Sequence, residues 1–117
     1  MELQLYIDEL RPLVDIDCGT TTLDGVAHVA GLMRQKYLDM GWHAELVDLG
    51  PAVGPGVLAT NKPGAEHYDV LLVGHLDTVF PVGTVAERPL SIDGNIARGP
   101  GAADMKAGLL NIAWALR

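Results

Sequence analysis

The chain has 117 residues, with 8 lysines and arginines against 15 aspartates and glutamates, and its formal net charge is −7. This acidic balance argues against binding to nucleic acid or to an anionic membrane through a basic surface. The composition, 49% apolar or aromatic and 20% charged, excludes general disorder, and no apolar run approaches the roughly 20 residues of a membrane-spanning helix.

Two amphipathic helices are predicted in the first part of the chain. Apolar residues recur at three- and four-residue steps from Glu2 to Ile16 and from Leu23 to Met40. Between them, residues 17–22 read Asp-Cys-Gly-Thr-Thr-Thr, a loop whose threonines can cap the second helix. Gly41 stands where a left-handed cap would end that helix.

Strands are predicted in the middle of the chain. Trp42 to Leu49 alternates loosely, and Val57 to Thr60 can form a second strand, with a hairpin as one connection between them. The run Val70 to Gly74 is continuously apolar, as expected for a central strand covered on both faces. Leu90 to Ala97 predicts a short hairpin about an Asp-Gly-Asn turn.

The final predicted element is a helix from Met105 to Arg117. Helices that alternate with buried strands indicate an α/β fold, in which a mixed sheet is flanked by helices. The last helix reaches Arg117 with neither a glycine cap nor a polar tail, so we expect residues 1–117 to be a truncated part of a larger domain. The acidic N-terminus does not resemble a secretory signal and Cys18 is the single cysteine, so we expect a cytoplasmic location.

One candidate site follows the predicted central strand. His75 lies at its carboxyl end and Asp77 two residues later, so their side chains point the same way in an extended segment. A carboxylate beside an imidazole can accept the ring N–H that is not used for coordination. In a metal site, His75 would bind the ion and Asp77 would orient His75; the alternative is that both are ordinary surface residues.

A second candidate site is the small-residue loop from Arg98 to Gly108, where Asp104 marks the junction between loop and helix. Asp104 could simply cap the helix. A phosphate-binding loop fails in detail, because Ala107 stands where Ser or Thr is required after Lys106 and a third glycine is missing. We expect Lys106 to be a solvated helix residue and Cys18 to be a small structural residue of its loop.

Taken together, these two segments resemble one enzyme family. They resemble the dinuclear zinc metallopeptidase family that includes glutamate carboxypeptidase, acetylornithine deacetylase and succinyl-diaminopimelate desuccinylase. The matching segments are Leu72-Val73-Gly74-His75-Leu76-Asp77-Thr78-Val79-Phe80-Pro81 and Gly99-Pro100-Gly101-Ala102-Ala103-Asp104-Met105-Lys106-Ala107-Gly108. Asp17-Cys18-Gly19-Thr20 with Asp24-Gly25 is similar to the glutamate carboxypeptidase branch. The resemblance implies the N-terminal part of a zinc-exopeptidase catalytic domain.

The resemblance also implies a role for each matching residue. His75 would bind one zinc ion, Asp104 would bridge two zinc ions, and Asp77 would orient His75; cobalt or manganese are alternative metals. The peptide bond between Asp104 and Met105 is usually cis in this family. The implied reaction is hydrolysis of the amide bond of a C-terminal or N-acylated amino acid by a water shared between the metals, with a glutamate as general base.

The chain departs from the family pattern after these motifs. It has no Glu after Glu87 and no His after His75, so the general base, the remaining ligands and the dimerisation domain are missing. We therefore expect a homodimeric parent enzyme that acts on peptides or N-acyl amino acids, and a chain that is itself inactive and self-associates. The alternatives are an N-acyl amino acid deacylase of the same family, and an inactive binding or structural module.

Overall fold

The computed structural model describes residues 2–117. Its α-helices are α1 (Leu3–Val14), α2 (Leu23–Asp39), α3 (Thr84–Glu87) and α4 (Ala107–Ala115), and a π-helical turn, η1 (Ala102–Lys106), leads into α4. Its strands form two antiparallel hairpins, β1 (His43–Val47) with β2 (Gly56–Thr60) and β3 (Ser91–Asp93) with β4 (Ile96–Arg98). The predicted α/β class is confirmed. None of the helices within residues 2–117 is long and apolar enough to cross a membrane.

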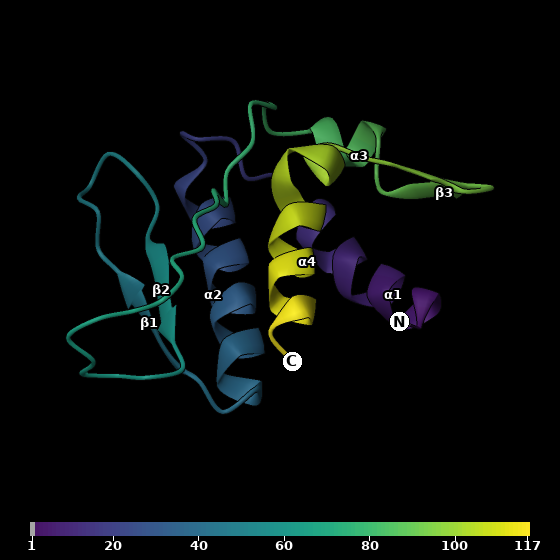
Figure 1. Ribbon diagram of the computed structural model, residues 1–117. Helices are drawn as coiled ribbons and strands as arrows, with labels where there is room; N and C mark the ends of the chain where they lie inside the picture. The colour runs from purple at the N-terminus through teal and green to yellow at the C-terminus, as the bar shows by residue number, and fades with distance from the viewer. Residues whose placement is uncertain (1) are drawn as a thin grey trace.

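The three long helices pack around one core. Helix α4 lies between α1 and α2, the β1–β2 hairpin lies on the outer side of α2, and β3 extends away from the helices (Figure 1). Helices α1 and α2 bury most of the apolar face that their periodicity predicts, although Leu3 of α1 is 68% exposed. Leu110 of α4 is fully buried, while Ile112 and the C-cap residue Leu116 are only partly buried. The buried residues are Leu10, Leu13 and Val14 from α1, Val26, Val29 and Met33 from α2, and Leu109, Leu110 and Ala113 from α4.

The helix ends agree with the sequence in part. Gly41 has a φ of +81° just after α2, in the left-handed conformation that was predicted for it. Thr22 is the N-cap residue of α2, but its side chain makes no capping hydrogen bond, so the predicted threonine cap is wrong. The last helix begins at Ala107 rather than Met105, because the backbone of Asp104 and Met105 departs from helical angles.

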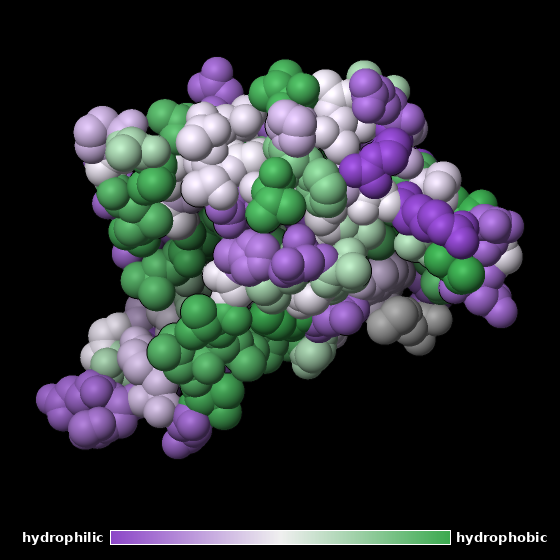
Figure 2. All heavy atoms as spheres, turned by 90° about the horizontal axis from the view of Figure 1, so that it is seen from above, coloured by the Kyte–Doolittle hydropathy of each residue, from purple (hydrophilic) through white to green (hydrophobic). Residues whose placement is uncertain are grey.

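The predicted central strand Val70 to Gly74 is wrong. Within residues 2–117 no strand pairs with it, and the side chains of Val70, Leu71, Leu72 and Val73 are 50% to 80% exposed. A continuous apolar run indicates burial on both faces, but the elements described here supply neither neighbouring strands nor covering layers. Seen from above, hydrophobic side chains gather in a continuous green area in the lower part of the view (Figure 2).

Carboxylates after α1 hold a distant segment in place. Asp17 accepts hydrogen bonds from the backbone N–H groups of Gly83 at 2.9 Å and Val85 at 3.1 Å, at the start of α3. Asp15 accepts one from the amide of Leu90 at 2.7 Å, and Arg11 donates to the Leu90 carbonyl at 2.7 Å. These contacts stabilise α3, a helix too short to show apolar periodicity in the sequence.

Candidate metal-binding site

Three loops converge on the two sequence motifs. The amide of Thr78 donates to the carbonyl of Cys18 at 2.9 Å, and the amide of Thr20 donates to the carbonyl of Thr78 at 3.1 Å. Gly19 and Thr78 thereby form an isolated parallel bridge. The loop after α1 is thus fixed beside the segment that carries His75.

Two glycines allow the loops to come close. A Cβ on Gly101, whose φ is +74°, would lie 2.6 Å from Cγ2 of Thr78. A Cβ on Gly74 would lie 2.9 Å from both Cδ2 of Leu109 and Cε of Met105. At Gly101 the left-handed backbone and the short contact together require glycine, whereas at Gly74 the neighbouring atoms are the ends of flexible side chains that can shift.

His75 and Asp104 meet at the centre of the site. Nε2 of His75 lies 2.8 Å from Oδ1 of Asp104, in direct hydrogen-bond contact. The alternative prediction, that Asp104 caps the last helix, is wrong, because its side chain turns to His75 and Lys106 is the N-cap residue of α4. The Asp104–Met105 peptide bond is cis, in agreement with the resemblance.

Asp77 lies on the other side of the imidazole. Nδ1 of His75 is 3.0 Å from the carbonyl oxygen of Asp77 and 3.3 Å from its Oδ1. Both ring nitrogens therefore face oxygen acceptors, an arrangement that favours the protonated ring. Accordingly the pKa of His75 is raised, chiefly by its hydrogen bond to the Asp104 carboxylate.

Thr20 orients the Asp77 carboxylate. Its hydroxyl donates a hydrogen bond to Oδ2 of Asp77, and this bond is the main reason why the pKa of Asp77 is lowered. The other carboxylate oxygen is left to face His75. The sequence carries no signal for this contact beyond the place of Thr20 in the loop, and the role of Thr20 was not predicted.

The donor atoms suit part of a zinc site. Zinc is commonly bound by imidazole nitrogen and carboxylate oxygen, and a zinc-binding imidazole usually gives its other N–H to a carboxylate or a carbonyl. His75, Asp104 and Asp77 match this pattern. They supply two ligands, and the part of the chain that the structure describes holds no cluster of three or more His, Cys, Asp or Glu side chains able to bind a metal. The residues fit a zinc ion as an incomplete ligand set.

Lys106 contradicts the sequence prediction. It is fully buried rather than solvated, with Nζ 2.9 Å from Sγ of Cys18 and in hydrogen-bond contact with the carbonyl of Leu76. Burial lowers its pKa. Because Lys106 precedes the regular helix, apolar periodicity gives no sign that it points inward. Cys18 is 1% exposed and has the structural position that was predicted for it.

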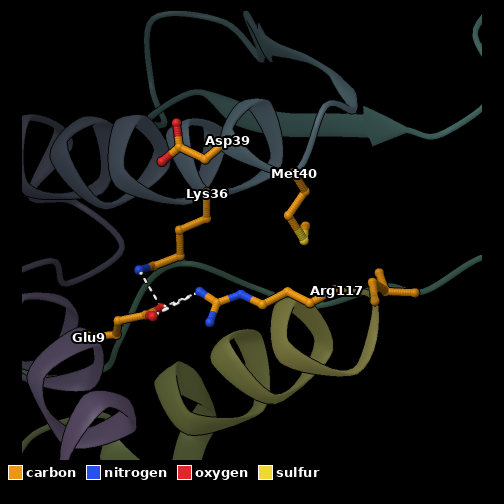
Figure 3. Close-up of a pocket in the computed structure, with 6 residues that line it drawn as sticks. Glu9, Lys36, Asp39, Met40 and Arg117 are labelled. Carbon is orange, nitrogen blue, oxygen red and sulfur yellow. Dashed lines mark hydrogen bonds and ion pairs between the residues drawn. The ribbon is translucent and has the colours of Figure 1, made fainter.

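A second ionic cluster lies between the helices. A cavity of about 510 Å³ between α1, α2 and the end of α4 is lined by Glu9, Lys36, Asp39, Met40, Leu116 and Arg117. In it, Glu9 accepts hydrogen bonds from Lys36 at 3.0 Å and from Arg117 at 2.8 Å (Figure 3). None of the residues predicted for the metal site lines this cavity. We therefore interpret the contacts of Glu9 with Lys36 and Arg117 as a structural ion-pair network between helices.

Comparison with known proteins agrees with one branch of the resemblance. No family model matches the chain. Among curated proteins, the chain is similar to carboxypeptidase G2 of Pseudomonas sp. (strain RS-16), with 32% identity over 108 residues. These residues are 92% of this chain and 26% of that protein, so the chain spans about a quarter of the length of the curated relative that it matches. The similarity supports the glutamate carboxypeptidase branch.

Proposed function

We propose that the chain is the first part of the catalytic domain of a zinc-dependent, carboxypeptidase-like hydrolase. The parent enzyme hydrolyses the amide bond of a C-terminal or N-acylated amino acid and works as a homodimer. The observation that carries the proposal is the 2.8 Å contact between Nε2 of His75 and Oδ1 of Asp104, with Asp77 at the opposite ring nitrogen. The similarity to a protein named carboxypeptidase supports the reaction class.

Each residue has a defined task in this proposal. Nε2 of His75 and the carboxylate of Asp104 are ligands, and Nε2 must lose its proton before it can bind a cation. Asp77 is a positioning residue, because its carbonyl and carboxylate hold Nδ1 of the same ring. A pair of zinc ions, when bound, would lower the pKa of a water molecule and polarise the scissile carbonyl. The remaining ligands and the general base are assigned to residues outside these 117.

Zinc titration followed by NMR tests the ligand assignment. In a chain with 15N-labelled histidines, we expect Zn2+ to shift the ring signals of His75 and to leave those of His28, His43 and His67 in place. His75→Ala should abolish zinc binding, and Asp104→Ala should weaken it by about tenfold. Equal responses from all four histidines, or unchanged affinity in His75→Ala, would refute the assignment.

The chain itself is proposed to lack peptidase activity, because two ligands cannot hold a catalytic pair of metals. With Zn2+ and an N-acyl glutamate as substrate, chromatography should detect no release of glutamate. His75→Ala is the matched control, since hydrolysis that persists in this variant comes from a contaminant. Zinc-dependent hydrolysis by the purified chain that is lost in His75→Ala would contradict this part of the proposal.

A further inference from the structure

Lys106 is the largest fully buried side chain among the described residues, and it lies two positions after Asp104. An ammonium group taken out of water is costly unless it is hydrogen-bonded, so its partners must be held firmly. Both ends of the residue are fixed. The backbone amide donates to the carbonyl of Gly101 at 2.9 Å, and Nζ contacts Cys18 and Leu76.

The contacts of Nζ form a closed triangle. Nζ lies 2.9 Å from Sγ of Cys18 and donates to the carbonyl oxygen of Leu76, and Sγ of Cys18 lies 3.6 Å from that same oxygen. Cys18 belongs to the loop after α1, Leu76 to the segment that carries His75, and Lys106 to the turn that carries Asp104. One side chain therefore joins all three loops of the candidate site.

Leu76 occupies the position between His75 and Asp77, so a donor on its carbonyl fixes the orientation of the Leu76–Asp77 peptide unit, next to His75. A second contact limits the same segment, since the backbone N–H of His75 lies 3.3 Å from Sδ of Met105. Without Nζ, the Leu76 carbonyl would keep only the weak 3.6 Å contact with the Cys18 thiol, and the His75 side chain would be free to move away from Asp104.

We infer that Lys106 is a positioning residue of the candidate metal site: its Nζ, seated against Cys18, holds the Leu76 carbonyl and thereby keeps His75 within reach of Asp104. The inference rests on the proposed function, because the pair that Lys106 aligns is the proposed ligand pair. It adds a role for a lysine that makes no contact with the metal ligands themselves.

The test compares Lys106→Met, which keeps the length of the side chain and removes the donor, with Leu13→Ala, a truncation in the core of α1. Two readouts are taken on folded protein: zinc affinity, and the metal-free ring signals of His75. Asp104→Ala supplies the reference signals of a ring that has lost its acceptor. We expect Lys106→Met to weaken zinc binding by about tenfold and to move the His75 signals toward that reference. Leu13→Ala should change neither readout.

Each outcome is informative. Lys106→Met with the zinc affinity and His75 signals of the unchanged chain overturns the inference and leaves the proposed function intact. Movement of the metal-free signals in a protein whose His75 never responds to Zn2+ supports the positioning role and refutes the metal site.

If Lys106→Met does not fold, Cys18→Ala decides, because it leaves Lys106 in place and removes one of the two partners of Nζ. A smaller shift of the His75 signals in the same direction is expected. Unchanged signals in Cys18→Ala would overturn the inference.

Discussion

The hydroxyl of Thr20 donates a hydrogen bond to Oδ2 of Asp77, across 57 positions of the chain. The amide of the same threonine donates to the carbonyl of Thr78 at 3.1 Å, so backbone and side chain fix the same neighbouring segment. Through these two bonds, the loop after α1 sets the direction of the carboxylate that faces His75.

Thr20→Val is expected to raise the pKa of Asp77 toward its ordinary value, because it removes the hydrogen bond that contributes most to lowering that pKa. An NMR titration of the side-chain carboxyl carbon of Asp77 measures the change. Thr21→Val, at the exposed neighbouring position, is the control and should leave that pKa in place. An equal rise in both variants would show that the loop as a whole, and not the Thr20 hydroxyl, is responsible.

Glu9 should make the stability depend on pH in the acid range. Burial raises its pKa, but the hydrogen bonds from Arg117 and Lys36 outweigh this effect and hold the pKa below its ordinary value. A lowered pKa in the folded state gives stability that is complete above the unfolded-state pKa of about 4.3 and is lost as the pH falls through the folded-state pKa.

Glu9→Gln is therefore expected to lower the free energy of unfolding by about 1 kcal/mol at neutral pH and to flatten its loss in acid. Urea unfolding at a series of pH values measures both effects. Glu66→Gln, which removes the same charge at an exposed loop position, should reproduce neither. A pH profile of Glu9→Gln that is parallel to that of the unchanged chain would contradict the assignment.

Gly25→Ala should be destabilising by roughly 1 to 3 kcal/mol, because the added methyl group would lie 1.8 Å from the backbone carbonyl oxygen of Asp17. Gly31→Ala is the matched control, since a Cβ at Gly31 meets no atom within 4 Å and the residue lies inside α2. That substitution should stabilise the protein by about 0.5 to 1 kcal/mol. Denaturant unfolding compares the two, and changes of the same sign would refute the close-approach argument.

The exposed apolar run Val70 to Val73 should cause self-association. Leu71→Asp is expected to reduce the mass measured by light scattering at high protein concentration, because it places a charge on a side chain that is 80% exposed. Leu3→Asp makes the same change of charge at a 68% exposed position on α1 and should have little effect. A clean monomer of the unchanged chain at high concentration would argue against this surface as a contact site.

Local sequence patterns predicted those elements whose stabilising contacts are themselves local. The periodicity of α1 and α2, the glycine after α2 and both hairpins need only neighbouring residues to be recognised. The run Val70 to Gly74 failed for the opposite reason. Its apolar residues indicate that burial is favourable, but whether strands lie beside them depends on the rest of the fold.

The candidate site was also predicted only in part. Two sequence motifs predicted that His75 and Asp104 lie close together, and their side chains are in contact. Lys106 was predicted to be solvated because a lysine near a helix start is usually exposed, and only the three-dimensional meeting with Cys18, 88 positions away, accounts for its burial. Their roles as ligands and as positioning residue stay predictions.

Asp104 and Lys106 are two positions apart, yet the side chain of Asp104 is 86% exposed and Lys106 is fully buried. In evolutionary terms, the atoms that would perform chemistry are thereby separated from the atoms that hold the scaffold together. Substitution of the exposed carboxylate removes few packing contacts, so mutations there would change a proposed ligand while the fold persists. Substitution of the buried lysine disturbs both at once, which leaves that position far less freedom to vary.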